Sequence, residues 1–138
     1  MARVTGAGGT VASYTWDLVG GRGPTEAIDA ELRNMGVPTA RLPNFDASAI
    51  DAMRDLWTEA GLVAVETREI TVRRTFADFA DYWAANLLNP RFGPAIAAMT
   101  SSNAERLKAR VQVRLPPDAA GHITDAATAN AIKACVPS

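Results

Sequence analysis

Trp16 and Asp17 end a run of β-branched and aromatic residues, Thr10-Val-Ala-Ser-Tyr-Thr-Trp16, which predicts a buried strand. In open α/β sheets, ligands bind beyond the carboxyl ends of the strands. A carboxylate at that place could orient a substrate hydroxyl, so Trp16 and Asp17 are candidate substrate-binding residues. The alternative is that Asp17 caps the turn that follows the strand.

The glycine-rich loop Gly20-Gly-Arg-Gly23 lies between this strand and an expected helix. Such a loop could bind an anion at the helix N-terminus, with Arg22 adding positive charge. The alternative is a flexible connection in which Gly23 is the N-cap. The earlier run Gly6-Ala-Gly-Gly9 is interpreted as a turn, because a strand and not a helix follows it.

The other residues with reactive side chains are isolated in the sequence. His122 could act as a base if it reached a pocket, but a surface role is favoured because no partner is visible. Cys135 lies between Ala134 and Val136 and is interpreted as a small buried hydrophobe. No metal site is expected from Asp51, Asp55 and Glu59, because nothing in the sequence brings further ligands to that helix face.

Two segments with apolar residues at helical spacing follow the loop, and each ends at a glycine. The first runs from Pro24 to Gly36, and the second runs from Ser48 to Gly61 with Asp46 or Ser48 as its N-cap.

The next apolar runs, residues 62–65 and 70–72, predict a strand with a bulge near Thr67-Arg68, because the inward-facing parity changes there. Three helices separated by prolines are then expected: one with a Thr75/Asp78 capping box that ends at Pro90, one from Pro94 towards Met99, and one with a Ser102/Glu105 capping box that ends at Pro116. The tail from Gly121 to Val136 predicts a final strand.

The expected order is strand, two helices, strand, three helices, strand. A strand-helix-strand crossover makes parallel neighbours with a right-handed connection. The sequence therefore predicts an α/β fold with a partial sheet of about three strands and a helical insertion before the last strand.

Composition limits the possible partners. The 138 residues carry 14 Lys and Arg against 15 Asp and Glu, so no basic surface for nucleic acid or anionic lipid is expected. One cysteine and one histidine exclude a disulfide framework and a Cys/His zinc site. No apolar run approaches the length of a membrane span, so we expect one soluble, cytoplasmic domain over residues 1–138.

Three passages resemble class I S-adenosylmethionine-dependent methyltransferases of the small-molecule branch. Residues 3–17, Arg-Val-Thr-Gly-Ala-Gly-Gly-Thr-Val-Ala-Ser-Tyr-Thr-Trp-Asp, resemble the turn and fifth strand of that family, with Ala7 where proline is usual. Ala60-Gly-Leu-Val-Ala-Val-Glu-Thr-Arg68 resembles the passage into its sixth strand, and Phe76-Ala-Asp-Phe-Ala-Asp-Tyr-Trp83 resembles a helical insertion before its last strand. The matches cover nearly all of this chain but only the second half of the family's domain.

The resemblance implies S-adenosylmethionine as the methyl donor and a small molecule as the acceptor. The glycine-rich turn and the acidic residue that hold the donor in such folds lie in the first half, so this chain is not expected to bind the donor or to be active alone. It also implies that Tyr82 and Trp83 could form part of a lid that excludes water from the acceptor. The alternative is that this aromatic stripe is core.

The competing function is a non-enzymatic oligomerising or partner-binding α/β module. A half sheet would leave the strand at residues 10–16 with an open apolar edge, which proteins seldom leave uncovered. A homodimer through that edge, or by exchange of elements, is therefore expected. A third possibility is a pocket protein that binds an apolar small molecule between the sheet and the aromatic helices.

Overall fold

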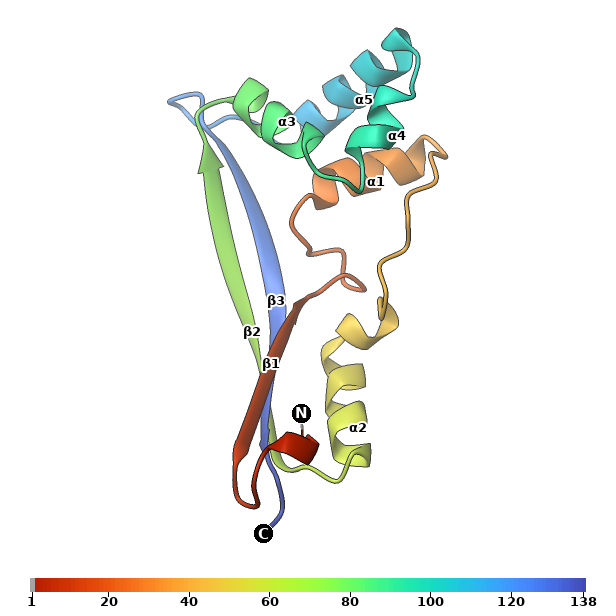
Figure 1. The fold of residues 1–138 in the computed structure, drawn as a ribbon. Coiled ribbons are helices and arrows are strands. Elements are labelled where there is room, and N and C mark those ends of the chain that lie inside the picture. Colours follow the sequence, from red (N-terminus) through yellow and green to blue (C-terminus); the bar gives the residue numbers. More distant parts are fainter. Residues whose placement is uncertain (1) are drawn as a thin grey trace. The chain divides into compact units, whose positions relative to one another are not determined.

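The computed structural model describes residues 2–138 and has the expected order of strands and helices (Figure 1). The longer elements are separated by loops and by the 3₁₀ turns Ala2–Val4 and Asp46–Ser48, and the fold class is α/β. Their bounds are β1 Thr10–Trp16, α1 Glu26–Asn34, α2 Ile50–Glu59, β2 Val63–Phe76, α3 Phe79–Leu87, α4 Gly93–Ala97, α5 Ser101–Arg114 and β3 Ile123–Cys135.

The three strands form one open sheet in the order β1-β3-β2. Strand β3 is antiparallel to β1, with Trp16 opposite Ala129 and Thr10 opposite Cys135. Strand β3 is also antiparallel to β2. The Thr71 hydroxyl bonds the Thr128 hydroxyl, and the Thr75 hydroxyl bonds the Thr124 hydroxyl, so residue numbers increase along β2 as they decrease along β3. The prediction that the crossover makes parallel neighbours is therefore wrong. Strands β1 and β2 do run in the same direction, but β3 lies between them.

Strand β2 is continuous, and the bulge expected at Thr67-Arg68 is absent. The contacts of Glu66 with Lys133 and of Thr71 with Thr128 have equal spacing along the two strands, so the register does not change between them. The backbone irregularity is instead at Ala64, which has a φ of 52° directly after the helix-to-strand turn.

Several expected helix starts are displaced, and at Ser48 and Thr75 the reason is that the expected capping residue has another partner. Helix α1 begins after Thr25, not at Gly23, and Ser48 binds a distant loop rather than the N-terminus of α2. Thr75 belongs to β2, where it pairs with Thr124, and Asp78 alone caps α3 by accepting from the Asp81 N–H at 2.8 Å.

The start of α5 is displaced in the same way. The Thr100 side chain, not that of Ser102, caps the helix by accepting from the Asn103 N–H at 3.3 Å. Each displacement is short and leaves the element itself in place.

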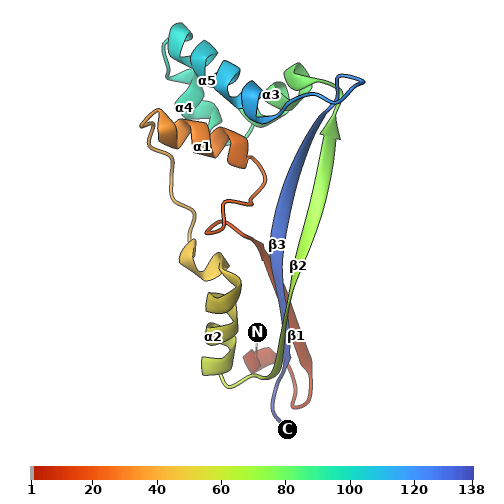
Figure 2. The ribbon, with the colours of Figure 1, turned by 180° about the vertical axis from the view of Figure 1, so that it is seen from behind.

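The chain divides into two compact units. The first contains the chain up to Pro24, residues 42–72 and residues 127–138. In it, α2 lies along one face of the sheet in both views (Figures 1 and 2), and Trp57 packs against buried Val11, Leu62 and Ala134. Among residues 2–138, no helix lies on the opposite face of this part of the sheet.

The second unit contains residues 25–41 and 73–126. Its core is larger and joins α1, α3, α4 and α5 to the ends of β2 and β3. The most deeply buried side chains are those of Ile28, Leu32, Tyr82, Phe92, Leu107 and Val111, each 0% exposed. Over residues 2–138, no helix has the length and apolar character needed to cross a bilayer.

Candidate functional site

Asp17 follows β1 and closes the turn after it. Its side chain is buried, and its Oδ1 accepts from the Gly20 N–H at 3.0 Å. Glycine is needed at position 20, because a Cβ there would lie 2.1 Å from Asp17 Oδ2. Asp17 therefore caps the turn, which was the alternative interpretation of this residue.

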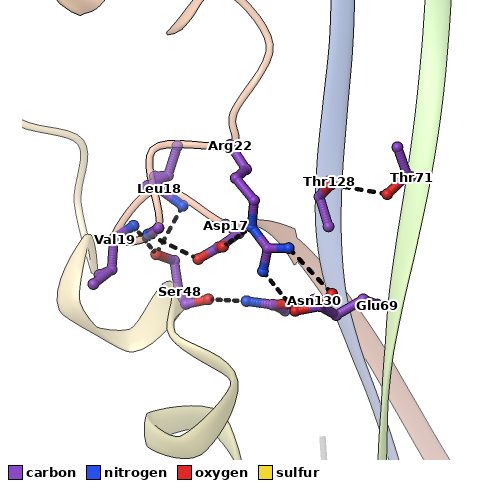
Figure 3. A network of polar contacts seen from close by, with 10 residues as sticks. Asp17, Leu18, Val19, Arg22, Ser48, Glu69, Thr71, Thr128 and Asn130 are labelled. Carbon is purple, nitrogen blue, oxygen red and sulfur yellow. Dashed lines mark hydrogen bonds and ion pairs between the residues drawn. The ribbon is translucent and has the colours of Figure 1, made fainter.

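Arg22 connects this turn to β2. Its Nε donates to Asp17 Oδ2 at 2.6 Å, and its two terminal nitrogens donate to the Glu69 carboxylate at 3.1 and 2.5 Å (Figure 3). These bonds, that to Glu69 above all, raise the pKa of Arg22, and the Arg22 guanidinium lowers the pKa of Glu69. A single cation thus lies between two carboxylates.

Backbone bonds attach the same loop to β3. The Asp17 N–H donates to the Thr128 carbonyl at 2.9 Å, and the Thr128 N–H donates to the Arg22 carbonyl at 2.8 Å. Arg22 N–H in turn donates to the Asp17 carbonyl at 2.9 Å. The loop is therefore an extension of the sheet ladder and not a flexible connection.

Ser48 and Asn130 support the loop from the α2 side (Figure 3). Ser48 Oγ accepts from the N–H groups of Leu18 and Val19, both at 3.2 Å, and Asn130 Nδ2 donates to the Ser48 carbonyl at 2.8 Å. Asn130 is 1% exposed, and its Oδ1 has no hydrogen-bond partner among the described residues. The side of the loop that faces α2 is thus held by buried polar side chains.

The exposed part of this network is the ion pair between Arg22 and Glu69. The side chain of Arg22 is 42% exposed and that of Glu69 49% exposed, whereas that of Asp17 is only 5% exposed. A ligand could reach the Arg22–Glu69 pair but not the Asp17 carboxylate. Asp17 is therefore a positioning residue for the loop.

The loop after β1 does not have the features expected of a site for S-adenosylmethionine. A donor site of the expected kind needs a free carboxylate for the ribose hydroxyls and a glycine-rich turn that opens a helix. Both carboxylates here are bound to Arg22, and α1 begins three residues after Gly23, with no side-chain cap from Thr25. The anion-binding interpretation of Arg22 meets the same obstacle, because its guanidinium is already paired with Asp17 and Glu69.

Trp16 and Asp17 point to opposite faces of the sheet. Val11 faces α2, and side chains alternate along a strand, so Ala12, Tyr14 and Trp16 share the face without a helix. An open groove of about 750 Å³ runs along that face, over β1, β3 and β2. Its lining mixes apolar Ala12, Tyr14 and Ile70 with charged residues, including Arg68 and Lys133.

Tyr82 and Trp83 belong to the other compact unit. Tyr82 is 0% exposed, its ring meets that of Phe76 edge to face at 5.2 Å, and Trp83 stacks on Phe79 at 6.1 Å. Burial, with the charges of Asp125 and Asp29, raises the pKa of the Tyr82 hydroxyl. Tyr82 therefore has no exposed surface that could contact a ligand, which agrees with the core interpretation. Trp83 is half-buried.

The remaining candidates lie apart from this network. His122 is half exposed, with its Nδ1 3.4 Å from Asp118 Oδ2, and the backbone N–H of His122 lowers the pKa of Asp118. Cys135 is half-buried, with its Sγ 4.0 Å from Thr10 Oγ1. The described part of the chain contains no group of three His, Cys, Asp or Glu side chains that could hold a metal ion.

Sequence reasoning missed the roles of Ser48, Glu69 and Asn130. Glu69 gave a usable signal, since its parity places it on the inward face with Val65, where an acidic residue needs a partner. Asn130 lies between alanines in the final strand and gave a similar signal. Ser48 resembled an ordinary helix cap, and only the fold shows its contact with residues 18 and 19.

A scan against protein-family models and a search of curated proteins each find no match to this chain.

Proposed function

We propose that this chain is part of a class I S-adenosylmethionine-dependent methyltransferase domain that acts on a small molecule. In this proposal it forms the acceptor side, and residues outside the chain hold the methyl donor. The resemblance of residues 3–17, 60–68 and 76–83 to that family supports the assignment. The observation that carries it is the sheet itself: β1 and β2 run in the same direction, and no described strand pairs with the outer edge of β1.

An antiparallel strand near the edge of an otherwise parallel sheet is common in large α/β folds. The described sheet has the form of such an edge, and it can be extended from β1. A Rossmann-like sheet with more parallel strands beyond β1 would place the donor site across the β1 edge, and this half would supply only walls that hold the acceptor in line.

Within this half, the chain's own residues have definite tasks. Trp16 offers an aromatic surface at the carboxyl end of β1, on the face without a helix, and the Arg22–Glu69 pair offers exposed polar groups on the α2 face. Asp17 holds the loop that carries Arg22. Trp83 stays a candidate for the lid. A cytoplasmic location belongs to the same proposal, because the single cysteine of the chain is free.

The test is calorimetry with S-adenosylmethionine on two proteins: this chain, and the product of the same reading frame extended upstream of Met1. The proposal predicts no saturable binding by the 138-residue chain and stoichiometric binding by the extended protein. Tight binding by the 138-residue chain alone would contradict it. An upstream sequence that encodes no glycine-rich strand-turn-helix would contradict it too.

A further inference from the structure

The outer edge of β1 is a row of backbone groups that pair with no described strand. The ladder bonds at the two ends of this strand involve odd positions: the Asp17 N–H donates to the Thr128 carbonyl, and the Gly9 carbonyl accepts from the Val136 N–H. In an antiparallel ladder, hydrogen-bonded positions alternate, so Val11, Ser13 and Thr15 also face β3. The backbone groups of Thr10, Ala12 and Tyr14, and the N–H of Trp16, therefore point outward.

This edge lacks the usual protection against pairing. Natural edge strands are blunted by charged side chains, prolines or bulges, whereas β1, Thr-Val-Ala-Ser-Tyr-Thr-Trp, contains none of these. The other outer strand, β2, is charged along its length, at Glu66, Arg68, Glu69, Arg73 and Arg74. Because β1 is uncharged, we expect it to pair with another uncharged strand and not with β2.

We infer that β1 pairs with β1 of a second copy of this chain, antiparallel and across a twofold axis at Ser13. In this register Ala12 lies opposite the partner's Tyr14, and Thr10 lies opposite the partner's Trp16. Every outward-facing residue of the strand then meets an outward-facing residue of the other copy. A shift by two residues in either direction would leave one outward-facing residue unmatched at each end of the interface.

The side chains agree with this register. On the open face, the ring of Tyr14, 75% exposed in the single chain, lies over the partner's Ala12, and no charge meets a like charge. On the α2 face, Ser13 meets its own copy. Pairing of β1 with a partner's β2 would be head-to-tail and would give rings or filaments, whereas the twofold pair is a closed dimer.

The inference does not depend on methyl transfer. A donor-binding part of a methyltransferase would extend the sheet at the same edge, so it and the second copy exclude each other. The dimer is a property of this 138-residue chain. Absence of a dimer would leave the calorimetric result with S-adenosylmethionine unaffected.

Light scattering on a sizing column tests the pairing at micromolar concentration. We expect a species of twice the 14.6 kDa chain mass for the unmodified chain and for Ile70→Lys, which charges the open face on β2. Ala12→Pro is expected to be monomeric, because proline removes only an outward-facing N–H and is tolerated on an edge strand. Tyr14→Lys is expected to be monomeric as well, and circular dichroism checks that each variant is folded.

A cysteine pair tests the register. In a Cys135→Ser background, Ser13→Cys places two thiols opposite each other in a non-hydrogen-bonded pair, with Cα atoms about 4.5 Å apart, within the range that a disulfide spans. Rapid formation of a covalent dimer is expected. Thr15→Cys is the matched control, because its partner position is Val11 and no disulfide is expected at a comparable rate.

A monomer at every micromolar concentration would overturn the inference. So would a dimer that survives Ala12→Pro and Tyr14→Lys but is lost in Ile70→Lys, since that pattern indicates packing through the open face. Faster cross-linking of Thr15→Cys than of Ser13→Cys would overturn the register.

Discussion

The buried carboxylate of Asp17 is the residue on which the β1 loop depends. Its two oxygens accept from the Gly20 N–H and from Arg22 Nε, so removing the side chain leaves both donors without their partner. Both donors belong to exposed residues, so water can replace the lost acceptor, and the loss is the net contribution of the two hydrogen bonds, about 1–3 kcal/mol together. We therefore expect Asp17→Ala to lower the free energy of unfolding by that amount in urea titrations.

Asp51→Ala is the matched control for this prediction. The Asp51 side chain is 83% exposed and pairs with Arg54 one helical turn away, and exposed pairs of this kind contribute about 0.5 kcal/mol or less. Asp17→Asn should retain the bond from the Gly20 N–H, so its free energy of unfolding should lie between those of Asp17→Ala and the unmodified chain. Equal effects of Asp17→Ala and Asp51→Ala would contradict the role given to Asp17.

The Tyr82 hydroxyl distinguishes a core residue from a lid residue. It is fully buried and has no hydrogen-bond partner among the described residues. Tyr82→Phe removes an unpaired polar group, so the free energy of unfolding should stay constant or rise by about 1 kcal/mol. Tyr82→Ala, which leaves a cavity, should lower it by about 3–5 kcal/mol. A large loss in Tyr82→Phe, measured by urea unfolding, would show that the hydroxyl has a partner.

Residue identities predicted the kind of side chain at the β1 loop but not its partners. Asp17 was placed correctly after the strand, and turn capping was one of its two interpretations. Its pairing with Arg22, five positions away, and the further link to Glu69 depend on strand β2 coming alongside. A local pattern contains no information on such contacts between distant segments.

At the scale of elements, Glu31 joins α1 to α5. Its carboxylate is bonded by Arg114 and by Arg110, and these bonds, with Arg114 first, lower its pKa from the ordinary value of about 4.5. A carboxyl whose folded pKa is depressed stabilises the fold above its unfolded pKa, and that stabilisation disappears as pH falls through the folded pKa. Glu31→Gln should lower the thermal midpoint at pH 7, and this effect should become smaller as pH falls below about 4.5 and through the lowered pKa of the folded state.

Asp125 on β3 has a pKa shift opposite in direction to that of Glu31, so it serves as the control for that prediction. Burial raises its pKa, so the folded carboxyl keeps its proton at a pH where the unfolded one has lost it. The contribution of Asp125 to stability therefore decreases as the pH rises above the ordinary pKa of an aspartate. Asp125→Asn should raise the thermal midpoint at pH 7. Midpoints of Glu31→Gln and Asp125→Asn that shift in the same direction at pH 7 would contradict both assignments.

The elements themselves were largely predictable, because each has a periodic apolar pattern and a turn residue at its end. Strand β1 matches residues 10–16, and the glycines at 36 and 61, with φ of 69° and 78°, end the helices as expected. The starts were less predictable. Ser48 and Thr75 have the chemistry of caps, but tertiary contacts with Leu18 and Thr124 take their hydroxyls.

At the scale of the whole molecule, the order of elements did not determine the sheet. A crossover between two strands fixes that they run in the same direction, and β1 and β2 do so. It does not fix adjacency, and the last strand, with its buried alanines at 127, 129 and 134, lies between them. Pairing of segments more than a hundred residues apart in the chain could not be derived from local periodicity.

The open edge of β1 is the feature on which both the incomplete methyltransferase sheet and the twofold dimer depend. Residue-resolved amide exchange by NMR tests it directly, because Ser13 and Thr15 face β3 while Ala12 and Tyr14 face outward. In dilute solution, the account predicts slow exchange at Ser13 and Thr15 and fast exchange at Ala12 and Tyr14, with the last two becoming slow as the protein is concentrated. Slow exchange at all four amides, independent of concentration, would show that the chain covers this edge itself and would contradict the account.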